Sequence, residues 1–101
     1  MITIRHTVSE VGQATELDGY YVLEGRPDVK VRVQVHLDRS YASQSWAKAS
    51  VWTELGWREI GTYAYSEWAS MKSRDGGTAS AQTRIRKATT FLLQLATEVL
   101  A

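Results

Sequence analysis

The chain has no cysteine and a single proline, Pro27, among its 101 residues. Without cysteine, disulfide bonds and thiolate zinc sites are excluded, and a reducing compartment such as the cytoplasm is the expected location. No apolar run approaches the roughly 20 residues of a transmembrane helix, and the first residues, MITIRHTV, lack the apolar segment of a signal peptide. We therefore expect one cytoplasmic domain, residues 1–101, that makes no contact with a membrane.

Strong charge of either sign is also missing, because the formal net charge is only +1. A net charge so close to zero argues against a protein that binds its partner by bulk electrostatic attraction. The charge is unevenly distributed, however, since Lys and Arg outnumber Asp and Glu from Lys72 onward.

Catalytic motifs are absent as well. The sequence contains no nucleophile elbow, P-loop, glycine-rich dinucleotide motif or HExxH pair. His6 and His36 lie on different predicted strands without nearby carboxylate partners, so each is expected to be an ordinary strand residue. We expect a protein that is not an enzyme and that binds no metal or cofactor.

The stretch from Trp46 to Tyr65 alternates in two runs that predict a β-hairpin with its loop at Leu55-Gly56. This loop would pair Trp52 with Glu59 and Lys48 with Tyr63, and would need a positive φ at Gly56. One face would then carry small, mostly apolar residues: Ala47, Ala49, Val51, Ile60, Thr62 and Ala64. The other would carry aromatic and charged residues: Trp46, Trp52, Trp57, Tyr63 and Tyr65 with Lys48, Glu54 and Glu59.

Three further strands are predicted by period-two alternation, over residues 1–8, 20–24 and 29–38. The third is the clearest, with valines and Leu37 on one face and Lys30, Arg32, Gln34 and His36 on the other. Residues 9–19 between the first two strands are polar and turn-rich; one or two amphipathic helical turns are conceivable there, although Gly12 weakens that interpretation.

The C-terminal stretch predicts a helix of about twenty residues that begins near Thr78 or Ser80. Its apolar stripe is Ala81, Ile85, Ala88, Leu92, Leu95 and Val99, widened by Phe91 and Leu100. Before it, residues 69–78 have the composition of a mobile loop. The fold class is therefore α+β: an antiparallel meander sheet of about five strands with a long C-terminal helix packed across one face.

Two packing arrangements are open. In the favoured one, the helix covers the valines and the small hairpin residues, which leaves the aromatic and basic side chains on the other face of the sheet. In the alternative, the aromatic side chains join the core and bury more area, but they draw Lys48 and Glu59 inward.

An exposed aromatic-basic face would suit single-stranded nucleic acid, because bases stack on aromatic rings while phosphates pair with Lys and Arg. The stacking candidates are Trp46, Trp52, Tyr63 and Tyr65. The phosphate-binding candidates are Lys30, Arg32 and Lys48, beside His36, with a possible extension along Arg84, Arg86 and Lys87 at the helix start.

Two other functions stay open. The same face could join a protein partner or a second copy in a homodimer, because aromatic residues are enriched at interfaces. In the order of its elements the chain also resembles helix-grip domains, with a strand, a helical segment, a meander and a closing helix. That resemblance implies a small-molecule site between sheet and helix.

Overall fold

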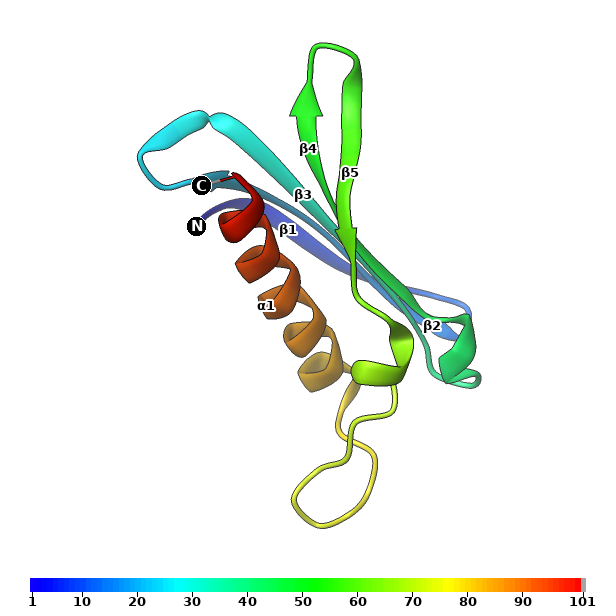
Figure 1. Ribbon diagram of the computed structural model, residues 1–101. Helices are drawn as coiled ribbons and strands as arrows, with labels where there is room; N and C mark the ends of the chain where they lie inside the picture. Colours follow the sequence, from blue (N-terminus) through cyan, green and yellow to red (C-terminus); the bar gives the residue numbers. More distant parts are fainter. Residues whose placement is uncertain (101) are drawn as a thin grey trace.

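The structure is a computed structural model that describes residues 1–100. Its elements are β1 (Ile2–Val11), β2 (Ala14–Leu23), β3 (Arg26–Asp38), the 3-10 turn η1 (Ala42–Gln44), β4 (Trp46–Thr53), β5 (Gly56–Thr62), the 3-10 turn η2 (Tyr65–Glu67) and α1 (Ala81–Leu100). The strands form one antiparallel sheet in the order β1-β2-β3-β4-β5. Figure 1 shows α1 lying across one face of this sheet. The predicted fold class is confirmed.

The core lies between α1 and β3–β4. Along β3, Val31, Val33, Val35 and Leu37 are at most 1% exposed, and they face Ile85, Ala88, Leu92 and Ala96 of the helix. Ala47 and Ala49 of β4 are at most 2% exposed and lie in the core with the helix residues, so the favoured packing arrangement is confirmed. Thr62 and Ala64, which were predicted on the same hairpin face, are exposed, and Thr62 pairs with Lys48. No helix of residues 1–100 is long and apolar enough to span a membrane.

The β1–β2 hairpin replaces the turn-rich segment predicted over residues 9–19. Val11 pairs with Ala14 around a two-residue loop in which Gly12 has a φ of 60°. The strand alternation of β2 was hidden in the sequence because two of its helix-side positions are Thr15 and Gly19 rather than apolar residues. The helical segment that a helix-grip domain would have at this point is absent.

The β4–β5 hairpin turns one residue earlier than predicted. Thr53 pairs with Gly56, so the loop is Glu54-Leu55, and Trp52 lies opposite Trp57 rather than Glu59. Gly56 does have a positive φ, 104°, as expected. A β-bulge at Ile60 then shifts the register, so that Lys48 pairs with Thr62 instead of Tyr63.

Helix α1 begins after Ser80, whose hydroxyl accepts a hydrogen bond from the Thr83 N–H at 3.1 Å. Ser80 is therefore the N-cap. The buried stripe continues from Leu92 to Ala96, whereas Val99, predicted to belong to it, is 53% exposed.

The segment between β5 and α1 is anchored by Trp68, which is fully buried and donates from Nε1 to the Tyr63 carbonyl at 3.2 Å. Further along, Lys72 and Thr78 form an isolated antiparallel bridge within the predicted loop.

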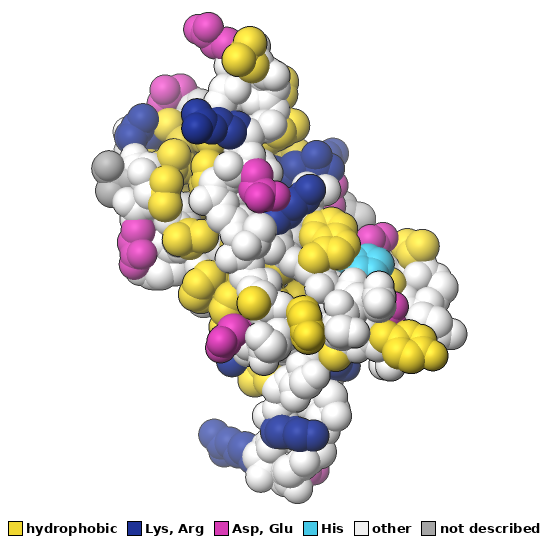
Figure 2. Space-filling view, turned by 45° about the vertical axis from the view of Figure 1, so that its right-hand side comes forward, with side chains coloured by type: hydrophobic (Ala, Val, Ile, Leu, Met, Phe, Trp, Pro, Cys, Tyr) yellow, Lys and Arg dark blue, Asp and Glu magenta, His cyan; other side chains and the backbone are white. Residues whose placement is uncertain are grey.

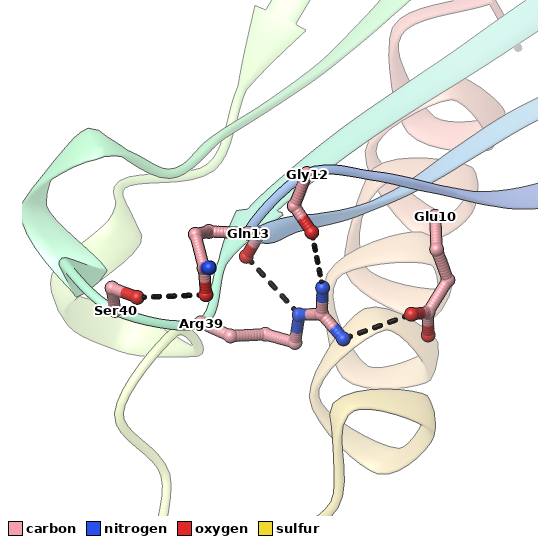
Figure 3. Close-up of polar contacts among 5 residues, drawn as sticks. All are labelled: Glu10, Gly12, Gln13, Arg39 and Ser40. Atoms are coloured by element: carbon pink, nitrogen blue, oxygen red, sulfur yellow. Dashed lines mark hydrogen bonds and ion pairs between the residues drawn. The ribbon is translucent and has the colours of Figure 1, made fainter.

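The two edges of the sheet are covered differently. Helix α1 packs on β3, β4 and β5 and reaches β2, while every residue of β1 is exposed. The far end of β1 is held by Arg39, which donates to the carbonyls of Gly12 and Gln13 at 2.7 and 3.1 Å and to the Glu10 carboxylate at 2.9 Å (Figure 3).

Candidate functional site

We define the open face as the side of the sheet turned away from α1. Its central side chains are Tyr20, Lys30, Arg32, Gln34, His36, Trp46, Lys48, Trp52 and Trp57. In Figure 2, hydrophobic side chains on the surface are interspersed with Lys, Arg, Asp and Glu side chains. The aromatic residues of this face form two clusters, one toward each end of β3.

The first cluster joins Tyr20, Trp52 and Trp57. The Trp52 and Trp57 rings meet edge to face at 5.3 Å between centroids, and Tyr20 lies 5.9 Å from Trp57. Trp52 is 53% exposed and Trp57 37% exposed, so both rings keep free surface. The Arg5 guanidinium lies over the Tyr20 ring, 5.0 Å from its centroid.

These rings line a shallow hollow of about 570 Å³, which Ile4, Arg5 and Lys30 complete. The hollow is mostly apolar, and both of its charged side chains are cations. It therefore combines flat aromatic surface with positive charge, a combination that suits a planar ring carrying an anionic group.

The second cluster is centred on Trp46, which stacks on His36 at 5.6 Å with an angle of 7° between the ring planes. The Lys48 ammonium lies 5.3 Å from the centre of the Trp46 ring. Trp46 and Lys48 line a second hollow of about 420 Å³ together with Tyr65 of η2, but Glu59 also contributes to it. This end of the face is aromatic with mixed charge.

Ion pairs neutralise part of the face. Arg32 donates to both carboxylate oxygens of Asp18 at 2.8 and 2.7 Å, and this hydrogen bonding raises the pKa of Arg32 above its usual value. His36 Nδ1 lies 2.8 Å from Glu16. Within residues 1–100, Arg5, Lys30 and Lys48 form no ion pair, so these three cations are the ones available to a ligand.

The prediction that the Tyr63 ring lies on the open face is wrong. The bulge at Ile60 turns it to the helix side, where its ring stacks on Phe91 at 3.8 Å between centroids. Tyr65 has left the strand for η2 but stays 43% exposed beside the second hollow.

The basic residues at the start of α1 lie on the other side of the sheet and do not extend the open face. Arg84 donates to the Ala69 carbonyl and Lys87 to the Glu67 carbonyl, each at 2.9 Å, which explains how these cations are accommodated near the helix N-terminus. Partial burial lowers the pKa of Arg84. Arg86 lines a groove between α1 and β1.

The sequence prediction omitted three residues that the structure brings together: Arg5, Tyr20 and Trp57. Trp57 was placed on the correct face, but only the true loop position sets it against Trp52. The position of Tyr20 and Arg5 on the open face could not be predicted, because it depends on how β1 and β2 pair with β3.

The structure brings no three metal-binding side chains together within residues 1–100. His36 lies on the open face and His6 on the helix side, where it lines the groove beside α1. The chemistry that the open face offers is stacking and charge pairing. Comparison with protein-family models, curated proteins and solved structures gave no significant match.

Proposed function

We propose that the protein is a non-catalytic module that binds single-stranded nucleic acid on the open face of its sheet. The observation that carries this proposal is the hollow between Tyr20, Trp52 and Trp57, with Arg5 and Lys30 at its border. A base inserted there meets aromatic rings, while its phosphate meets cations that have no carboxylate partner within residues 1–100.

Stacking on an aromatic side chain contributes on the order of 1–3 kcal/mol per base. The first cluster supplies one stacking site, and Trp46 with Tyr65 supplies a second, near Lys48. Two stacked bases with two or three phosphate contacts account for micromolar binding of a short strand. With Arg32 paired to Asp18, the ligand gains little from that residue.

The direct test is a titration with oligothymidylate, followed by tryptophan emission. Trp46, Trp52 and Trp57 are exposed and should be quenched, while the buried Trp68 should keep its emission. Three phosphate contacts predict that log K falls with log salt with a slope of about −2. Lys30→Ala should reduce that slope by about 0.7, and Trp57→Ala should lower affinity about tenfold or more.

Lys72→Ala is the matched control for Lys30→Ala, since it removes the same charge from the loop beyond η2 and should leave binding unchanged. If the parent shows no quenching at low salt, or if Lys72→Ala and Lys30→Ala weaken binding equally, the proposal is wrong. If binding is insensitive to salt and Trp52→Ala splits a dimer instead, the open face joins protein chains rather than nucleic acid.

A second candidate function is small-molecule binding in the groove between α1 and the β1–β2 half of the sheet. This groove has a volume of about 690 Å³. One observation favours it: Thr15 lines the groove, and its buried hydroxyl has no hydrogen-bond partner within residues 1–100. Native mass spectrometry of the purified protein should then show an added mass that Thr15→Val loses. The mass of the bare chain would contradict this candidate.

A further inference from the structure

Strand β1 is an edge strand that nothing in residues 1–100 covers. All ten of its residues are exposed, and Ile2, Ile4, Val8 and Val11 are each 54–57% exposed. The opposite edge, β5, packs against α1. A long exposed edge strand with free backbone groups is a template for another strand, and natural proteins normally shorten, charge or cover such an edge.

The hydrogen-bond pattern decides which residues of β1 can receive such a strand. The Arg39 N–H donates to the Gln13 carbonyl at 2.9 Å, so Gln13 directs its backbone groups toward β3. By alternation the even-numbered residues of β2 bond to β1, beginning with Ala14 opposite Val11. Along β1, the backbone groups of residues 11, 9, 7 and 5 therefore form hydrogen bonds with β2. The N–H and C=O groups of His6, Val8 and Glu10 point away from the sheet and are free to pair with another strand.

We propose that two copies of this chain form a symmetric dimer by antiparallel pairing of β1 with β1, centred on Val8. A twofold axis can pass through an outward residue or through the inward residue between two of them, and only the register centred on Val8 pairs all three outward residues of each chain with one another. Centring on Glu10 would set two carboxylates together, and centring on His6 would run the pairing into the bulge at Ile4. Centring on Thr7 or Ser9 would pair only two of the three outward residues of each chain, so the Val8 register forms the most backbone hydrogen bonds.

The side chains that meet in this register are complementary. Val8 of one chain lies opposite Val8 of the second chain. His6 of each chain lies opposite Glu10 of the other, so the interface contains two pairs of an imidazole and a carboxylate. Thr7 lies opposite Ser9 on the open face. The Glu10 carboxylate is already positioned by Arg39, so little side-chain freedom is lost when it pairs (Figure 3).

The twofold axis would run perpendicular to the sheet, because both strands present the same face in this register. The two sheets would then join into one, with both helices on the same side and the two open faces continuous. Helix α1 lies over β3–β5, which leaves room at the joined edges. Three hydrogen-bonded pairs would contribute about six backbone hydrogen bonds.

Sedimentation equilibrium over micromolar to millimolar concentrations tests the proposal with the intact chain. The parent should approach twice the 11.4 kDa of one chain. Val8→Lys brings two ammonium groups together at the axis and should raise the dimer dissociation constant at least about tenfold. Ile2→Lys is the matched control, with the same exposure of 54% but outside the paired residues, and should leave the constant unchanged.

Charge exchange and cross-linking test the register. Glu10→Lys should weaken the dimer, and adding His6→Glu should restore it. Because the chain has no cysteine, Val8→Cys should give a disulfide-linked dimer on mild oxidation: the Cα atoms of such a pair lie about 5.5 Å apart, within the usual disulfide range. Ile2→Cys should not cross-link.

Three results would overturn the proposal. The first is a parent that is a monomer at millimolar concentration. The second is a dimer that Val8→Lys leaves as tight as the parent. The third is a dimer that Trp52→Ala dissociates while Val8→Lys does not, because it would place the interface on the open face.

Discussion

The two faces of the sheet are made of different kinds of side chain, although the same five strands supply both. On the helix side, β3 and β4 present valines and alanines that are almost completely buried, and α1 lies close to their backbone. On the open face, Trp46, Trp52 and Trp57 are 37–53% exposed, and the charges between them are partly paired.

This difference separates the residues that stabilise the fold from those that are free to bind. Apolar burial is the main source of stability, and the fully buried side chains face α1 or lie beside it. The open face adds ring contacts and partly buried ion pairs, which contribute less to the free energy of unfolding than the apolar core does. Its residues can therefore be replaced with small cost to folding.

The same substitution at two tryptophans gives the sharpest test of this separation. Trp68→Ala removes a fully buried ring and its hydrogen bond to the Tyr63 carbonyl, and should lower the free energy of unfolding by about 3–5 kcal/mol. Trp52→Ala removes a ring that is 53% exposed and in contact with Trp57, and should cost about 1 kcal/mol. Urea unfolding followed by far-UV circular dichroism measures both.

Equal losses for the two variants would contradict the separation. In that case the first aromatic cluster would belong to the core in solution, and affinity changes in Trp57→Ala would reflect unfolding rather than lost stacking.

Much of the fold could be predicted because the clearest hydrophobic patterns in the sequence belong to residues that are buried in the structure. The alternation of Val31, Val33, Val35 and Leu37 marks β3, and the spacing of Ile85, Ala88 and Leu92 marks α1. Ala47 and Ala49, two of the small residues on one hairpin face, correctly indicated where the helix packs. Alternation over residues 1–8 correctly predicted most of β1, but the β1–β2 hairpin was missed because Thr15 and Gly19 interrupt the apolar alternation of β2.

The candidate site was predicted less well, for reasons of register. The hairpin loop displaced by one residue changes which residues lie opposite each other, and the bulge at Ile60 moves Tyr63 to the other face. Bulges leave no clear sequence signal, and one extra residue inverts the orientation of everything beyond it. The partners of Arg32, Arg84 and Lys87 are distant in the chain, so that sequence alone could not show these cations to be engaged.

Gly61 tests how closely the helix approaches the sheet. A Cβ atom at this position would overlap Cδ2 of Leu95 on α1, so Gly61→Ala should force α1 or Leu95 to shift and cost about 1–3 kcal/mol. Gly77→Ala is the control. A Cβ atom added there would lie 3.4 Å from its nearest neighbour, a carboxylate oxygen of Asp75, in an exposed loop. Thermal or urea unfolding gives the comparison.

Shortening Leu95 should relieve the overlap. The double variant Gly61→Ala, Leu95→Ala should be less destabilised than the sum of the two single variants, as expected for residues in contact. Additive effects would show that the helix does not lie against Gly61.

The smallest expected change is at Thr15, which lies on the helix side of β2 and lines the groove beside α1. Its hydroxyl is buried without a partner within residues 1–100, and a buried unpaired hydroxyl is costly. Thr15→Val keeps the shape, removes that cost and should raise the free energy of unfolding by about 1 kcal/mol. Thr53→Val is the matched control: its hydroxyl donates to the Gly56 carbonyl at 2.8 Å, so the same substitution should lower stability by about 1 kcal/mol. If Thr15→Val is also destabilising, the hydroxyl has a partner in solution, either an ordered water or a molecule bound in the groove beside α1.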